Sequence, residues 1–234
     1  MAASSTHETD HMVSAAARVA FVHSGVVNIA LFTALAAELL PGATIVNYLD
    51  DGVVADLADA DRAASVPIRV GELVRAAVAD GADAVMLTCS SISALAAPLA
   101  RVAGVPVLRV DEALADAAVR AGRRIRVLAT LETTRRPTLA LLEERAALAG
   151  AEPELSSEIV DGAFAAVVAG DRAMHDRLVV DAIARGTAEA DVIVLAQASM
   201  ATAADAASVA VPVVTSPRLA VERLAALLAA RERA

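Results

Sequence analysis

Two stretches of this chain repeat the same succession of short apolar segments. Three pairs of segments correspond, namely residues 82–89 with 190–197, 19–23 with 126–130, and 105–107 with 211–213. The offset is 108 residues from Cys89 to Gln197, 107 for the second pair and 106 for the third. Such nearly constant spacing indicates a structural duplication. We therefore expect two similar halves, with the only cysteine at the strand end that one half presents to the other.

Valine- and isoleucine-rich runs alternate with alanine-rich amphipathic stretches, which is typical of a parallel α/β protein. The sequence predicts strands at 18–23, 44–48, 84–88, 105–110, 126–130, 152–156, 192–196 and 211–215. It predicts helices at 27–40, 66–79, 93–102, 111–121, 134–149, 171–187, 200–207 and 218–231.

The expected fold class is α/β, with two pseudo-symmetric, Rossmann-like (flavodoxin-like) parallel-sheet domains. We expect residues 18–102 with 211–234 to form the first domain and residues 103–210 to form the second. Ligands of such sheets bind outside the carboxyl ends of the strands. The active site should therefore lie in the cleft between the domains.

Composition argues against several partners. The net charge of −9 repels phosphate backbones, and aromatic residues make up only 2%, so no nucleic-acid partner is expected. Apolar windows stay shorter than the roughly 18 residues of a membrane helix, so no membrane partner is expected. Residues 1–17 lack a secretory signal pattern and are expected to be a disordered leader, partly a cloning remnant. A single cysteine permits no intramolecular disulfide and fits a reducing cytoplasm.

Cofactor and metal motifs are missing from the sequence. Neither G-x-G-x-x-G after the first strand nor G-x-x-x-x-G-K-[ST] occurs, so dinucleotide and P-loop chemistry lack support. The four histidines are scattered, and Cys89 has no partner at ligand spacing. We expect no cofactor and no metal.

Cys89 is the main catalytic candidate because it follows an apolar strand where a helix begins. Helix N-terminal amides at that position would stabilise a thiolate. The alternative is a buried cysteine that acts as a small hydrophobe. Thr88 ends the same strand, and Ser90 and Ser91 either cap the helix or contact a substrate.

The first two strands also end in polar residues. His23 either orients or deprotonates a thiol or substrate, or is a satisfied polar side chain at the rim. Ser24 and Gly25 offer a hydroxyl and a backbone N–H to an anion. After the second strand come Tyr48 and the acidic pair Asp50 and Asp51, which could perform acid–base chemistry or be solvated.

The second half offers hydroxyls and an amide at the matching strand ends. Three threonines surround an expected helix start, a pattern suited to carboxylate binding: Thr130, Thr133 and Thr134. Three residues occupy the counterpart of the cysteine segment: Gln197, Ala198 and Ser199. Gln197 can form hydrogen bonds but cannot act as a proton-transferring base. His175, in mid-helix among charged neighbours, is expected at the surface.

Four segments resemble the aspartate/glutamate/hydantoin racemase superfamily, which includes maleate isomerase and arylmalonate decarboxylase. They are D-A-V-M-L-T-C at 83–89, L-A-T-L-E-T-T at 128–134, V-I-V-L-A-Q-A-S-M at 192–200 and F-V-H-S-G at 21–25. The resemblance covers nearly the whole chain from Arg18 onward. Segment 192–200 resembles the family's second cysteine segment, with Gln197 in place of the cysteine. His23 stands where glutamate racemases carry an aspartate.

The resemblance implies a cofactor-free enzyme that binds a small carboxylic acid between two domains. In two-cysteine members, one thiolate removes the proton beside the carboxylate and the other thiol delivers one on the opposite face. Gln197 breaks that pattern, so we expect an isomerase or decarboxylase-type lyase that uses the single thiol of Cys89. Two alternatives stay open: a two-base racemase using Cys89 with His23 or with Asp50 or Asp51, and a non-catalytic carboxylate-binding protein. A homo-oligomer is expected.

Overall fold

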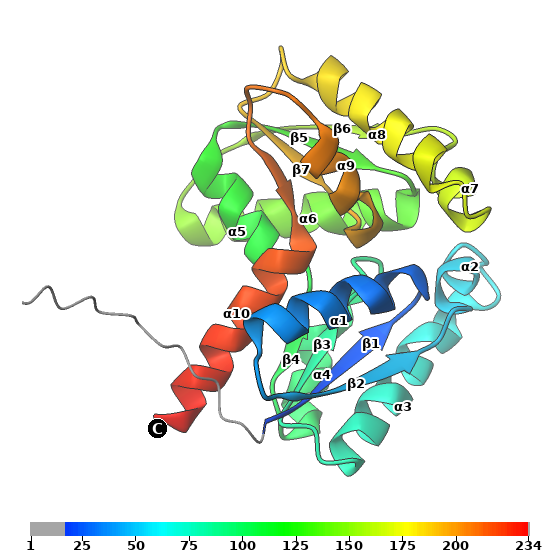
Figure 1. Cartoon of the computed structure of the whole chain (residues 1–234), viewed down its shortest axis with the longest axis vertical. Helices are drawn as coiled ribbons and strands as arrows, with labels where there is room; N and C mark the ends of the chain where they lie inside the picture. The colour runs from blue at the N-terminus through cyan, green and yellow to red at the C-terminus, as the bar shows by residue number, and fades with distance from the viewer. Residues whose placement is uncertain (1–16, 234) are drawn as a thin grey trace, which may run out of the picture.

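The computed structural model of the protein describes residues 17–233, apart from the side chain of Glu232. The expected disordered leader therefore lies almost wholly outside the described residues. Two halves lie one above the other along the long axis of the molecule (Figure 1). Each half is built on a four-stranded parallel sheet, which confirms the expected fold class.

The two sheets have the same strand order. The first sheet contains β1 Arg18–His23, β2 Thr44–Leu49, β3 Ala84–Leu87 and β4 Val107–Arg109, in the order β2-β1-β3-β4. The second contains β5 Arg124–Ala129, β6 Glu154–Ile159, β7 Val192–Leu195 and β8 Val213–Thr215, in the order β6-β5-β7-β8. The duplication inferred from sequence is therefore a duplication of topology.

Helices connect the strands in both halves. Those of the first half are α1 Val27–Leu39, α2 Val53–Leu57, α3 Val66–Ala79 and α4 Ala96–Ala103. Those that follow are α5 Glu112–Ala121, α6 Glu132–Ala149, α7 Ala163–Val168, α8 Arg172–Gly186, α9 Ala201–Ala206 and α10 Ser216–Glu232. Three short 3₁₀ turns complete the described chain, at Ala63–Ser65, Ser93–Leu95 and Ala198–Met200.

The central strands are apolar throughout because both of their faces are buried. In β1, Val19 and Phe21 belong to one core cluster, while Ala20 and Val22 belong to another on the opposite face of the sheet. Side chains alternate between faces along a strand, so helices on both faces require a continuous apolar run. The second sheet has the same two-sided core.

The last helix of each half packs against the sheet of the other half. α5 follows β4, yet its Leu114 and Ala118 pack with β5 and β7 of the second sheet. α10 follows β8, yet its Val221 and Leu224 pack with β1 and α1 of the first half. α10 also contacts α5, and in Figure 1 α10 runs beside the first half while α5 lies in the second.

Two strands lie in a different half from the one that the expected boundaries assign. β4 falls after residue 102 but pairs with β3 of the first sheet. β8 falls after residue 211 but pairs with β7 of the second sheet. Both are short edge strands whose neighbours are set by long-range pairing, which the local pattern does not encode. The chain crosses between halves after these strands, immediately before α5 and α10.

Candidate active site

A cavity of about 330 Å³ lies between the two halves, at the carboxyl ends of the strands. The segments that follow every strand except the edge strands β4 and β8 contribute to its lining. Ten of the residues expected at the site line this cavity: Ser24, Gly25, Thr88, Cys89, Ser90, Ser91, Thr134, Gln197, Ala198 and Ser199. Four others do not line it: His23, Tyr48, Thr130 and Thr133.

Cys89 is a free, half-buried thiol in the turn after β3. The residues beside it bind the second half of the molecule. The Ser90 hydroxyl donates to the Ala196 carbonyl at 2.7 Å, and the Ser91 and Thr134 hydroxyls are 3.1 Å apart. These bonds join the end of β3 to the end of β7 and to the first turn of α6. The thiol is therefore held at the boundary between the halves.

A buried polar network lies behind the Cys89 turn. The Ser93 hydroxyl donates to Asp111 Oδ2 at 2.6 Å and lies 3.1 Å from the Ser90 carbonyl. Arg109 Nε donates to Asp111 Oδ1 at 3.1 Å. Ser93 and Asp111 are almost fully buried. Charge-assisted bonds in such a setting are strong, so the network fixes the turn that carries the thiol.

His23 is buried behind the cavity, and both of its ring nitrogens are engaged. Nε2 lies 2.9 Å from Asn47 Oδ1, and Nδ1 lies 2.8 Å from the Thr88 hydroxyl. Burial lowers the pKa of His23 below its ordinary value, and the bond to Asn47 opposes this only in part. The Thr88 hydroxyl also lies 3.0 Å from the Val22 carbonyl, and its single proton can go to only one of these two acceptors. The geometry therefore matches the satisfied polar side chain that the sequence left as an alternative.

Gln197 lines the cavity with its amide bonded to Thr130 at both ends. The Thr130 backbone N–H donates to Oε1 at 2.8 Å, and Nε2 donates to the Thr130 hydroxyl. Thr130 thus lies behind Gln197 and holds its orientation. The amide at this strand end is held by these two bonds, and it cannot act as a proton-transferring acid or base.

The strand register corrects one pair of the sequence duplication. Val22 pairs with Leu87 in the first sheet, and Leu128 pairs with Leu195 in the second. His23 therefore corresponds to Ala129, not to Thr130. Ser24 and Thr130 occupy equivalent positions, so a hydroxyl follows the first strand of both halves.

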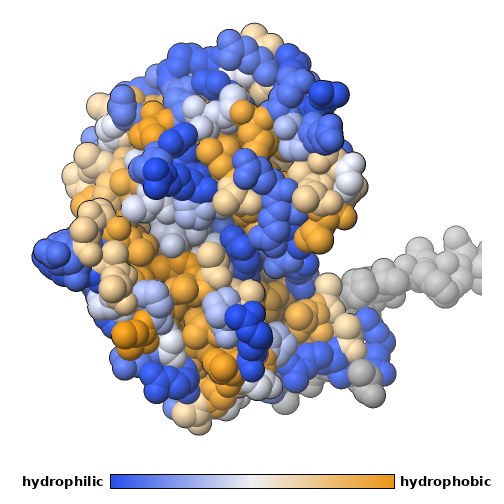
Figure 2. All heavy atoms as spheres, turned by 180° about the vertical axis from the view of Figure 1, so that it is seen from behind, coloured by the Kyte–Doolittle hydropathy of each residue, from blue (hydrophilic) through white to orange (hydrophobic). Residues whose placement is uncertain are grey.

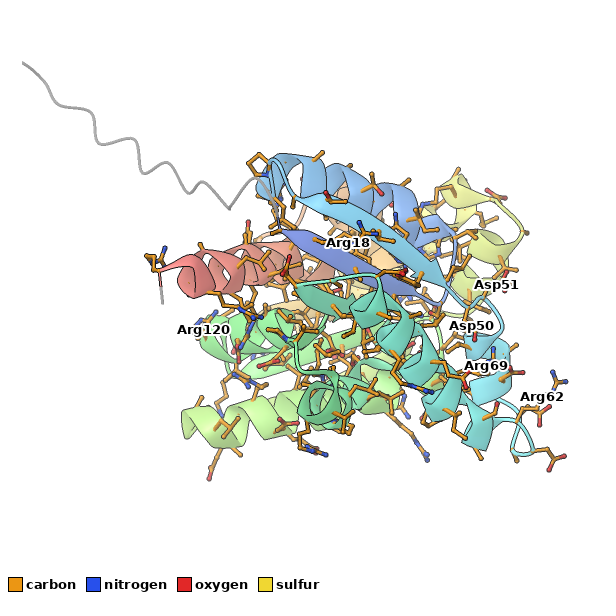
Figure 3. The ribbon with its side chains drawn as sticks, turned by 90° about the horizontal axis from the view of Figure 1, so that it is seen from below. Arg18, Asp50, Asp51, Arg62, Arg69 and Arg120 are labelled. Carbon is orange, nitrogen blue, oxygen red and sulfur yellow. The ribbon has the colours of Figure 1, made fainter. Side chains whose placement is uncertain are left out.

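The remaining polar candidates point elsewhere or lie at the rim. The Tyr48 hydroxyl donates to Asp80, at the end of α3. Thr133 is in the first turn of α6, and its buried hydroxyl finds no partner among the described residues. Asp50 is bound by Arg69, beside which it lies in Figure 3, whereas the exposed Asp51 lines the cavity. The two acidic residues therefore do not act as a pair.

His175 is buried, contrary to expectation. Its Nδ1 lies 2.9 Å from the Ala163 carbonyl at the start of α7, and its exposed fraction is 0%. The charged neighbours in sequence lie on other faces of α8. Helical spacing would have predicted the burial of His175, because it places His175 on the same face of α8 as Val179 and Ala182. Both of these residues are also buried.

Sequence reasoning missed an apolar part of the lining. Its members come from the start of α1, from α2, from the turn after β5 and from α7: Val26, Val27, Val54, Leu131, Phe164, Val167 and Val168. We call these seven residues the apolar wall. Asn28 also lines the cavity. α2 and α7, of five and six residues, were not expected, although α9, also of six residues, was predicted. One sequence signal for α7 was available. Residues 163–168 form an apolar run that follows the polar strand at 154–159.

Charge is sparse in this cavity. Within the described chain, the lining contains no arginine or histidine, and Asp51 is its only carboxylate. No group of three or more potential metal ligands occurs in residues 17–233. None of the helices in that range is long and apolar enough to cross a membrane. On the face opposite to that of Figure 1, apolar side chains are exposed where the halves meet (Figure 2).

Comparison with known proteins connects this architecture to one family. The family model described as Asp/Glu/Hydantoin racemase matches residues 4–224. The chain belongs to this family, whose members include racemases and a decarboxylase. A search of curated proteins gave no significant match.

Several solved structures share the fold. Allantoin racemase from Klebsiella pneumoniae is 21% identical, with 92% of this chain and 89% of that chain covered and a TM-score of 0.68. Glutamate racemase from Francisella tularensis, solved with D-glutamate, is 16% identical, with coverages of 92% and 82% and a TM-score of 0.70. A mutant of arylmalonate decarboxylase is 20% identical, with coverages of 91% and 93% and a TM-score of 0.58.

Proposed function

We propose that this chain is a cofactor-independent isomerase or lyase that acts on the carbon beside the carboxylate of a small acid. Its single thiol, Cys89, would transfer the proton. One observation carries the proposal: Cys89 lines the cavity, while the duplicated position is occupied by Gln197, whose amide is bonded to Thr130. The site therefore has a thiol on one side of the pseudo-symmetry and a non-ionisable group on the other.

Neutral donors would bind the substrate carboxylate. Ser24, Ser91 and Thr134 carry hydroxyls in the lining. The backbone N–H groups of Ser90 and Ser91 take part in none of the hydrogen bonds among the described residues. Hydrogen bonds from neutral donors to a carboxylate are charge-assisted and suffice for a small anion. Bound there, the acid would have its adjacent carbon next to the Cys89 thiol.

Two reactions fit a single thiol. In isomerisation, the thiolate removes the proton beside the carboxylate and returns it after rearrangement. In decarboxylation, loss of carbon dioxide leaves a carbanion that takes the thiol proton, and water then reprotonates the thiolate. In both reactions, protons would be exchanged on only one face of the reacting carbon, because Gln197 cannot transfer a proton to the other face.

The absence of lysine supports cofactor independence. All 20 basic residues of the chain are arginine. Pyridoxal phosphate enzymes hold their cofactor through a lysine Schiff base. This sequence cannot form that linkage, which argues against pyridoxal phosphate as a cofactor. A free thiol of this kind also favours a reducing compartment, and we place the protein in the cytoplasm. The expected homo-oligomer stays a prediction.

The two-base alternative gains less support from the geometry. His23 lies outside the lining, with both nitrogens bonded and a lowered pKa. Asp51 is the other ionisable side chain of the lining. A racemase would therefore have to use Asp51, which is exposed, or rearrange His23.

Proton exchange in deuterated water tests the proposal. The purified chain is incubated with a panel of small 2-substituted acids and malonates, and the products are followed by NMR and chiral chromatography. We expect the product to carry deuterium at the reacting carbon in a single configuration. We expect the Cys89→Ser variant to incorporate no deuterium. Appearance of both enantiomers in equal final amounts would establish a two-base racemase. Protection of Cys89 by acids without any turnover would identify a binding protein.

A further inference from the structure

The cavity lining divides into a polar part and the apolar wall. The polar part carries the thiol and the hydroxyls that follow the strands, whereas the wall comes mainly from α1, α2 and α7. Several wall side chains are unusually exposed for valine: Val26 at 59%, Val27 at 51% and Val168 at 71%. A substituent on the substrate would cover apolar surface that is now in water, which is favourable.

Among residues 17–233, the arginines beside the lining already pair with carboxylates. Three arginines lie next to lining residues, and each is already paired within the described structure. Arg69 pairs with Asp50 and Asp56, Arg135 with Glu132, and Arg172 with Asp176. Arg172, which is not a lining residue, also donates to the Ser199 carbonyl at 2.7 Å and to the Thr202 hydroxyl at 3.1 Å.

A side-chain carboxylate would therefore be penalised in this cavity. An anion placed against the seven apolar wall side chains would have neither a counter-ion nor a hydrogen-bonding side chain among them, which is unfavourable. Asp51, the only charged residue of the lining, would repel it further. The cavity of about 330 Å³ is at the lower end of ligand-site volumes, so a small ligand cannot keep its charge far from the wall.

We propose that the substrate carries an apolar substituent, aliphatic or aryl, on its reacting carbon, and that α7 sets this preference. Acids with a carboxylate at the end of the substituent, such as aspartate- or glutamate-like compounds, are excluded. The inference rests on the proposed function of the same site and names its substrate class. Phe164, Val167 and Val168 are the specificity-determining residues.

Protection of Cys89 from alkylation measures this preference directly. Cys89 is the only cysteine, so mass spectrometry of iodoacetamide labelling reports one site. The apolar probes are 2-phenylpropanoate and 4-methylpentanoate, and the dicarboxylate probes are succinate and glutarate. We expect the apolar acids to half-protect the thiol at concentrations at least about ten-fold lower than glutarate. Equal or better protection by glutarate would overturn the inference while leaving the proposed function intact.

A charge introduced into the wall should invert the preference. Val168→Arg adds a cation at an exposed lining position, so glutarate should gain at least about ten-fold in protection and 2-phenylpropanoate should lose. Val102→Arg is the matched control, because Val102 is an exposed valine near the end of α4 and outside the lining. An unchanged ratio in Val168→Arg would overturn the role of α7. Failure of every acid to protect Cys89 would instead refute the proposed function, and this inference with it.

Discussion

Gln197 and Thr130 are joined by two hydrogen bonds across the end of the second sheet. The Thr130 N–H donates to the Gln197 amide oxygen at 2.8 Å, and the Gln197 amide nitrogen donates to the Thr130 hydroxyl. In the other half, Cys89 occupies the position equivalent to Gln197, and Ser24 the position equivalent to Thr130. The two sides of the cavity thus share a backbone plan but differ in their ability to exchange a proton.

Replacement of Gln197 by cysteine should restore a second proton carrier. Gln197→Cys is expected to produce both enantiomers from an enantiopure acid that the unmodified protein keeps in one configuration. Chiral chromatography of the product measures this. Gln197→Ala is the control, since it removes the same two bonds without adding a thiol. Racemisation by both variants would show that the loss of the amide, not the gain of a thiol, is responsible.

Cys89→Ser should lower turnover by a factor of about 10³ or more, because a hydroxyl is a far weaker acid than a thiol at neutral pH. The fold should persist, since the side chain is half-buried and makes no hydrogen bond among the described residues. Steady-state kinetics and a thermal unfolding curve check both statements. Retention of most of the activity would return Cys89 to a structural role.

Thr134→Ala should weaken carboxylate binding by roughly ten-fold, as loss of one hydrogen bond to a charged group predicts. Thr134 lines the cavity, and its hydroxyl lies 3.1 Å from that of Ser91. Thr138→Ala is the matched control, because that hydroxyl donates to the Thr134 carbonyl within α6 and is outside the lining. Calorimetric titration with a probe acid distinguishes the two. Equal affinities would remove Thr134 from the binding site.

His23 should make the protein less stable as the solution becomes acidic. Because burial lowers its pKa in the folded state, the unfolded chain takes up a proton at higher pH than the folded chain. Its stabilising contribution is therefore complete above the unfolded value of about 6.5 and declines as the pH falls below it. Urea unfolding midpoints between about pH 7 and pH 5 should fall less in His23→Asn. Identical pH slopes would contradict this.

Asp111→Asn should destabilise the protein by about 3–5 kcal/mol, since it leaves the charge of Arg109 without its buried partner. Asp59→Asn breaks the exposed pair with Arg62 and should change stability by less than about 1 kcal/mol. Urea unfolding compares the two. If Asp111→Asn also raises KM at a temperature where it is folded, the network positions the Cys89 turn. An effect like that of Asp59→Asn would mean that the network adds little.

Local pattern was enough to locate all eight strands and eight of the ten α-helices of the described residues, because strand and helix periods are short-range properties. It was not enough for α2 and α7, which have five and six residues. Both carry members of the apolar wall. The helices that carry much of the proposed specificity surface were therefore absent from the predicted elements.

The sequence by itself determined the class of fold, the duplication and the position of Cys89 at a strand end. It also indicated that Gln197 occupies the position equivalent to Cys89. Only the tertiary structure decided which strand ends share a cavity. It turned His23 inward to Asn47 and Thr88, bound Thr130 to Gln197, and placed β4 and β8 in their sheets. The physical reason is that hydrogen-bond partners and edge-strand neighbours are set by contacts between residues far apart in the chain, which no local period records.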